Sequence, residues 1–195
     1  MDIQQLLALF TFVLISTASP GPNNIMLMTS GANIGFLRTV PHMLGVVFGF
    51  SFMVLLVGLG LMSLFKLYPV LHQLLNIACI TYLFYLAFKI ARSQPGSSDA
   101  EYQPMSFLAA SYFQWINPKA WTMAITAVSV YNSLNNWQGV LIVSLMFGLV
   151  NMPSATLWIY AGQKLQIWLN SPLRVKWFNY SMSTLLVLSV VPMML

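Results

Sequence analysis

Two proline-containing segments of this chain combine residue types that could bind a small polar solute. The first segment is Pro20, Gly21, Pro22, Asn23 and Asn24. Proline has no backbone N–H and clashes with the preceding turn, so a helix through this segment must kink or unwind. The freed backbone groups, the start of the helix that resumes near Pro22 and the two asparagine amides can then engage a carboxylate or an ammonium group. We predict a binding site here; the open alternative is a kink that serves only helix packing.

The second segment places a lysine beside a proline. It consists of Asn117, Pro118 and Lys119, with Gln114 one turn earlier. A lysine inside an apolar stretch needs a partner or contact with water. Because the apolar stretches contain no acid, the partner must be a solute, the backbone or solvent, and a carboxylate-bearing solute would suit it. The alternative is that the lysine stem reaches out to the membrane interface.

A third asparagine near a proline repeats this theme. Asn151 is followed two residues later by Pro153. We predict that Asn151 lines the same cavity, and the alternative is that this pair marks only a structural kink.

The stretches that must position these residues are apolar enough to cross a membrane. Of 195 residues, 58% are hydrophobic and 6% are charged, far fewer charges than soluble domains carry. A spanning helix needs about 20 residues. We expect an all-α integral membrane protein with six transmembrane helices, at Ile3 to Thr29, Val40 to Phe65, Val70 to Ile90, Met105 to Tyr131, Trp137 to Ala161 and Trp177 to Leu195. The last is polar between residues 179 and 183, so five spans remain an alternative.

A polar interval divides the chain into two halves of three expected spans. The linker covers residues 93–103, and the halves, about 1–92 and 104–195, together form a single transmembrane domain spanning 1–195. Three is an odd number, so the second half would enter the membrane in the opposite direction from the first. Matching proline breaks in helices 1 and 4 favour two inverted repeats with a site near the midplane.

The basic residues sort by loop in this arrangement. One side carries Arg38, Lys89, Arg92, Lys164, Arg174 and Lys176, whereas the other carries Lys66. Loops rich in Lys and Arg stay cytoplasmic, so both termini are predicted to face outward.

Catalytic chemistry has little support in this sequence. The single Cys79 provides neither a disulfide framework nor a metal cluster. We find no nucleophile triad and no paired carboxylates. The basic residues are dispersed over loops, which argues against nucleic-acid binding. We expect neither an enzyme nor a cofactor.

Several motifs resemble those of the LysE/RhtB family of amino-acid exporters. The segment from Thr17 to Asn24 resembles the N-terminal signature of that family, and the segment from Gln114 to Lys119 resembles its Asn-Pro-Lys motif. Further similarity covers Gly31, Gly35, Gly45, Gly49 and the segment from Tyr85 to Lys89. Residues 22–25 and 113–114 look most like the cysteine and O-acetylserine exporter branch.

The resemblance implies a multi-pass secondary transporter of the bacterial inner membrane. The outward-facing termini predicted from the basic loops would then lie in the periplasm. The transporter would export small amino acids or their derivatives, driven by the proton gradient. The carboxylates Asp2, Asp99 and Glu101 all fall outside the expected spans. A cationic substrate would therefore lack a counter-charge, and neutral amino acids fit better, whether cysteine/O-acetylserine-like or homoserine/threonine-like. The proton would also lack an intramembrane acid to carry it.

The expected partners are the amino-acid substrate, protons as coupling ion and membrane lipid, and a homo-oligomer is left open. Export of another small metabolite remains an alternative. A non-transporting membrane scaffold and a thiol carrier are further alternatives, although a thiol carrier would need more than Cys79.

Overall fold

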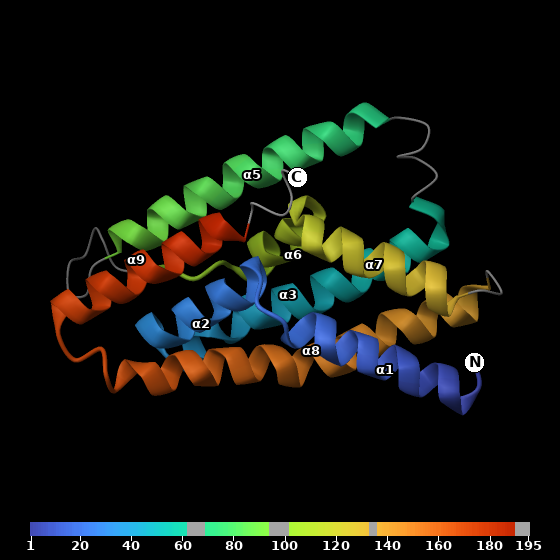
Figure 1. The fold of residues 1–195 in the computed structure, drawn as a ribbon, viewed down its shortest axis with the longest axis horizontal. Coiled ribbons are helices and arrows are strands. Elements are labelled where there is room, and N and C mark those ends of the chain that lie inside the picture. Colours follow the sequence, from blue (N-terminus) through green and yellow to red (C-terminus); the bar gives the residue numbers. More distant parts are fainter. Residues whose placement is uncertain (62–68, 94–101, 133–135, 190–195) are drawn as a thin grey trace.

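Helices make up nearly all of the computed structural model, which describes residues 1–61, 69–93, 102–132 and 136–189; within these ranges there is no strand (Figure 1). The all-α class is confirmed for these residues. In chain order the helices are α1 (Ile3–Ala18), α2 (Pro22–Ile34), α3 (Phe36–Leu56), the π-helical turn η1 (Val57–Leu61), α5 (Pro69–Arg92), α6 (Phe107–Ile116), α7 (Pro118–Tyr131), α8 (Trp137–Gln166) and α9 (Pro172–Leu188). Most of the expected linker and the basic residue Lys66 lie outside the described residues.

Two of these helical segments are long and apolar enough to cross a membrane on their own. They are Phe36–Leu61, which is α3 with η1, and Trp137–Gln166, which is α8. Helices α1 and α2 meet the same criterion together and are bent by 55° at the break between them. The described residues therefore provide two candidate spans, or three if the bent pair is one span, rather than the six expected.

Both helix breaks occur where the prolines predict them. Helix α1 ends at Ala18 and α2 begins with Pro22, whereas α6 ends at Ile116 and α7 begins with Pro118. Proline is compatible with the first helical position because the N–H at that position has no partner within the helix. Pro153, in contrast, lies inside the continuous helix α8.

Helix α8 is the central packing element of the fold. It contacts α1, α2 and α3, while α3 also packs on α6, and α5 packs on α9 (Figure 1). The largest buried apolar cluster lies where α1, α3, α7 and α8 meet, and it includes Val13, Phe50, Ala124 and Phe147.

Glycines allow the closest of these helix contacts. A Cβ atom at Gly31 of α2 would collide with the Ile159 carbonyl of α8, and one at Gly45 of α3 would collide with the Phe107 carbonyl of α6. Gly49 likewise faces the backbone of α6. These three glycines therefore serve close helix packing. Gly35 differs: a Cβ atom there would meet nothing within 4 Å, but its φ of 79° favours glycine, so its role is to turn the chain from α2 into α3.

Two polar side chains of α9, Asn179 and Ser183, form hydrogen bonds with other segments of the chain. Asn179 is fully buried; it donates to the carbonyl of Ser93 at 3.2 Å and accepts from the amide of Asn33 at 3.0 Å. Ser183 donates to the carbonyl of Ala87 in α5 at 2.8 Å. The helix begins at Pro172, ahead of the expected start at Trp177, and these polar side chains face protein rather than lipid.

Candidate functional site at two helix breaks

The break between α1 and α2 is held by side chains that replace missing backbone donors. Because Pro20 and Pro22 have no N–H, the carbonyls of Ser16 and Ala18 lose their helical partners. The Ser19 hydroxyl donates to the Ser16 carbonyl at 2.8 Å, and the Trp158 indole donates to the Ala18 carbonyl at 3.3 Å. These bonds satisfy backbone acceptors that would otherwise be unpaired in a membrane interior.

Asn24 closes the end of α1. Its amide donates to the carbonyl of Thr17 at 2.7 Å and to that of Ser19 at 2.9 Å. The side chain is buried. Asn24 therefore stabilises the unwound segment directly.

Lys119 extends from the start of α7 into the break between α1 and α2. Its Nζ donates to the Ser19 carbonyl at 2.9 Å, to the Ser19 hydroxyl at 2.8 Å and to the Pro20 carbonyl at 3.2 Å. Gly21 makes room for the lysine stem, since a Cβ atom there would lie 2.8 Å from Lys119 Cδ. The sequence left a solute, the backbone or solvent as possible partners of Lys119. In the structure its partners are two backbone carbonyls and one hydroxyl.

A second link joins the two breaks. Asn23 of α2 and Gln114 of α6 form a reciprocal amide pair, with Asn23 donating at 2.8 Å and Gln114 donating at 3.2 Å. Gln114 is fully buried and also donates to the Ala110 carbonyl at 2.8 Å. The pair connects residues 91 positions apart in sequence.

The start of α7 is capped from within the second break. The Asn117 side chain accepts from the backbone N–H of Lys119 at 3.1 Å. The start of α2 has no corresponding side-chain cap at Gly21. The two helix starts therefore differ: the first turn of α7 has a side-chain cap for one of its backbone N–H groups, whereas the first turn of α2 has none.

These groups surround a small cavity of about 20 Å³. It is lined by Ser16, Thr17, Gly21, Asn23, Asn24, Val46, Phe50, Asn117, Lys119, Met123 and Asn151. A cavity of this volume holds about one water molecule. An amino acid would fit only after the break opens, so this conformation is closed at the cavity.

All ten residues predicted from the sequence have a place in this arrangement. Six line the cavity, namely Gly21, Asn23, Asn24, Asn117, Lys119 and Asn151. Pro20 provides a carbonyl to Lys119, and Gln114 pairs with Asn23. Pro22 and Pro118 begin α2 and α7.

Sequence reasoning missed Ser19 and Trp158. Ser19 adjoins the first break, and a hydroxyl at that position is a usable signal, because serine side chains often satisfy local carbonyls. Trp158 and the apolar wall formed by Val46, Phe50 and Met123 carry no signal in the sequence.

Acidic groups are scarce in the part of the chain that the structure describes. Its one acidic side chain, Asp2, caps α1 by accepting from the backbone N–H of Gln5 at 2.7 Å. The charge that the described residues bring to the cavity is therefore the ammonium of Lys119.

The fold and the site together define a helical membrane protein in which two interrupted helices meet around a partly buried lysine. Residues 14–194 match the family described as LysE type translocator, and the chain belongs to this family. The family resemblance of the motifs is thus confirmed.

Similar proteins include the cysteine/O-acetylserine efflux proteins of Salmonella choleraesuis (strain SC-B67), Salmonella typhimurium (strain LT2) and Escherichia coli (strain K12). Each is 30% identical to this chain over 163 residues, which cover 82% of this chain and 83% of the relative. No solved structure matches this chain.

Proposed function

We propose that this chain is a secondary transporter that exports small neutral amino acids or their derivatives from the cytoplasm across the bacterial inner membrane. The contact of Lys119 with Ser19 and Pro20 carries this proposal, because it joins the two helix breaks around one cavity. The names of the relatives support cysteine and O-acetylserine as the first substrates to test.

Substrate binding would exchange the partners of Lys119. Its present acceptors are two carbonyls and a hydroxyl, all uncharged. A substrate carboxylate would bring a full negative charge and form an ion pair with the ammonium, which these uncharged acceptors cannot do. When Lys119 turns to that carboxylate, the carbonyls of Ser19 and Pro20 each regain one acceptor position for the substrate ammonium, while the Ser19 carbonyl keeps its bond from Asn24. A zwitterion would thus provide a carboxylate for Lys119 and an ammonium for the two carbonyls. A substrate with a cationic side chain would find no acid among the described lining residues.

This exchange would also open the closed cavity. The bonds of Lys119 hold α7 against the break, and the Asn23–Gln114 pair holds α2 against α6. Loss of the first link would loosen the two broken helices relative to each other. We infer alternating access around this point, as expected for a site between repeated halves of a transporter.

The proposed architecture is six transmembrane helices in two inverted repeats. Broken helix α1–α2 and broken helix α6–α7 run in opposite directions along the long axis in Figure 1. The same holds for α3 against α8 and for α5 against α9. This arrangement supports a second half inserted opposite to the first.

The proposed topology places both termini in the periplasm. The beginnings of α3 and α9 and the ends of α5 and α8 gather at one end of the molecule, at the left in Figure 1. Lys89 and Arg92 end α5, and Lys164 lies near the end of α8. A basic end is expected to face the cytoplasm.

Proton coupling is part of the proposal, and it would operate without an acid among the described residues at the cavity. The remaining proton carriers are the substrate, which can itself ionise, and Lys119. A coupled exporter predicts efflux that depends on the proton gradient.

Purified protein in proteoliposomes tests this function. The vesicles are loaded with radiolabelled cysteine, O-acetylserine, threonine or lysine, and efflux is compared with and without an imposed proton gradient. We expect gradient-stimulated efflux of the neutral amino acids and no efflux of lysine. Absence of flux for the whole panel would favour a scaffold, and flux that ignores the gradient would remove proton coupling.

A further inference from the structure

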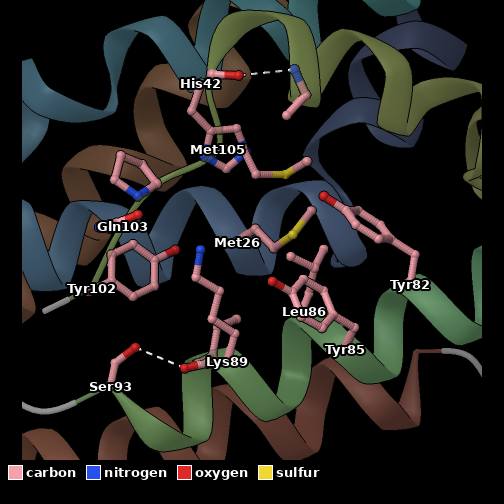
Figure 2. Close-up of a pocket in the computed structure, with 14 residues that line it drawn as sticks. Met26, His42, Tyr82, Tyr85, Leu86, Lys89, Ser93, Tyr102, Gln103 and Met105 are labelled. Atoms are coloured by element: carbon pink, nitrogen blue, oxygen red, sulfur yellow. Dashed lines mark hydrogen bonds between the residues drawn. The ribbon is translucent and has the colours of Figure 1, made fainter. Parts of the chain in front are cut away.

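A larger cavity of about 240 Å³ lies apart from the helix breaks. It is enclosed by α2, α3, the end of α5, the stretch at residues 102–106 and the beginning of α6 (Figure 2). It has no lining residue in common with the small cavity at the breaks. Its position at the end of α5 places it near the basic end of the molecule.

One buried group in this cavity has an unused hydrogen-bonding position. His42 of α3 is fully buried, and its Nε2 has no hydrogen-bond partner in the part of the chain that the structure describes. Its Nδ1 lies 3.4 Å from the hydroxyl of Ser30, which in turn lies 2.8 Å from the hydroxyl of Tyr102. Buried polar atoms are normally paired, so the free Nε2 indicates that a polar ligand or water belongs beside it.

Tyr102 adds a neutral hydroxyl to the same wall. Burial raises the pKa of Tyr102 to about 12, although the hydrogen bond to Ser30 acts in the opposite direction. The phenol therefore stays protonated at physiological pH and can take part in hydrogen bonds as donor and as acceptor.

Lys89 supplies the positive charge of the cavity. Figure 2 shows its side chain rising from α5 toward the hydroxyl of Tyr102. The side chain is exposed and forms no ion pair or hydrogen bond with other described residues. A free ammonium at the mouth of a cavity is suited to bind a carboxylate.

The opposite part of the cavity is apolar and aromatic. Met26 and Met105 bring thioethers, while Tyr82 and Tyr85 bring aromatic rings (Figure 2). Methionine adapts to small apolar groups of varied shape, and aromatic ring faces attract ammonium groups. The cavity therefore combines a cationic end with a wall that accepts a short side chain and an amine.

We propose that this cavity is a loading site that binds the amino-acid substrate before it reaches the helix breaks. The substrate carboxylate binds Lys89 and the hydroxyl of Tyr102. With the Nδ1 proton of His42 directed at Ser30, the Nε2 accepts from the substrate ammonium. This proposal rests on the proposed function, because it assigns a second binding step to the same export reaction.

Protection of an engineered cysteine tests the loading site. Gln103 lines the cavity and is exposed, so Gln103→Cys in a Cys79→Ser background gives one reactive thiol in this cavity. The protein is reconstituted in lipid nanodiscs, and its rate of modification by a maleimide is measured over increasing O-acetylserine. We expect O-acetylserine to slow modification, both in this parent and after a further Lys119→Ala substitution.

Replacement of Lys89 tests whether protection of the thiol at position 103 arises from O-acetylserine bound in this cavity. Lys89→Gln is expected to weaken protection by about tenfold in apparent affinity, since a charge-assisted hydrogen bond is lost. Lys89→Arg should retain most of the protection. Lys164→Gln removes one charge at the same end of the molecule, outside the cavity, and should leave protection unchanged.

The outcomes distinguish the two proposals. Transport of O-acetylserine by the parent without any protection of the thiol introduced at position 103 would overturn the loading site and leave the export function standing. Equal protection in Lys89→Gln and the parent would also overturn it. Protection without transport would support the binding site and contradict export, and absence of both would contradict both proposals.

Discussion

The ammonium of Lys119 lies 2.9 Å from the carbonyl oxygen of Ser19 and 2.8 Å from its hydroxyl, so a cation from the second half of the chain occupies the helix break of the first. The break thereby has a charged partner while the cavity beside it holds only about 20 Å³. A ligand with a carboxylate would compete for that cation. The contact is therefore the link that substrate binding is expected to break.

Gly21→Ala is expected to displace Lys119 without removing its charge. A Cβ atom at residue 21 would lie 2.8 Å from Lys119 Cδ and 3.0 Å from Nζ. We predict that O-acetylserine efflux falls about tenfold, as expected for the loss of one hydrogen bond to a charged group. The measurement is the initial efflux rate per reconstituted protein.

Gly148→Ala is the matched control for that substitution. Its Cβ atom would meet the hydroxyl of Ser51 at 3.1 Å, and the end of that side chain can rotate away. Efflux should stay near the parent rate in this variant. Equal rates for the variants at 21 and 148 would contradict the proposed role of the space beside Lys119.

Asn23 and Gln114 are expected to act as one unit. We predict that Asn23→Ala abolishes export while the protein still inserts into the membrane, because the pair across the breaks is lost. In a double-mutant cycle on thermal stability, Asn23→Ala and Gln114→Ala should show a coupling of about 0.5–3 kcal/mol, as residues in contact do. Fully additive effects would show that the pair contributes no coupling between α2 and α6.

The positions of the helix breaks could be predicted because proline acts locally. Pro22 and Pro118 each begin a helix, as the loss of a backbone donor requires. Pro153 shows the limit of this rule. Helix α8 continues through it, since packing of a long helix outweighs one missing hydrogen bond.

The partner of Lys119 could not be predicted from the sequence. Solute, backbone and solvent were all compatible with a lysine in an apolar stretch, and the selection of Ser19 depends on how α7 packs against α1. The indole of Trp158 reaches Ala18 across 140 positions of sequence, which no local pattern encodes. Composition and length predicted the helical class, whereas the number of spans depends on how each helix is placed relative to the bilayer.

Gly162→Ala is expected to reduce stability without touching the cavity. Its Cβ atom would collide with the carbonyl of Met28, a backbone group that cannot move independently of α2. Overpacking of this kind costs about 1–3 kcal/mol. The check is thermal unfolding in detergent, with Ala161→Ser at the neighbouring exposed position as control. An unchanged melting temperature for Gly162→Ala would contradict the close contact between α2 and α8.

Both termini are expected to face the periplasm. Reporter fusions whose activity depends on the compartment, placed at Met1 and after Leu195, should report the periplasmic side for both ends. A cytoplasmic signal at both ends would reverse the topology, and opposite signals would mean an odd number of spans.

Efflux by a Lys119→Ala variant is the most direct test of the site. Parent, Lys119→Ala and the control Lys164→Ala are reconstituted at equal amounts, and release of labelled O-acetylserine is followed with a proton gradient imposed. Lys164 lies over the ring of Tyr160, away from the breaks, so its replacement should leave efflux intact. We predict that Lys119→Ala releases no more label than protein-free vesicles. Efflux by Lys119→Ala at the parent rate would contradict the assignment of the substrate site to the two helix breaks.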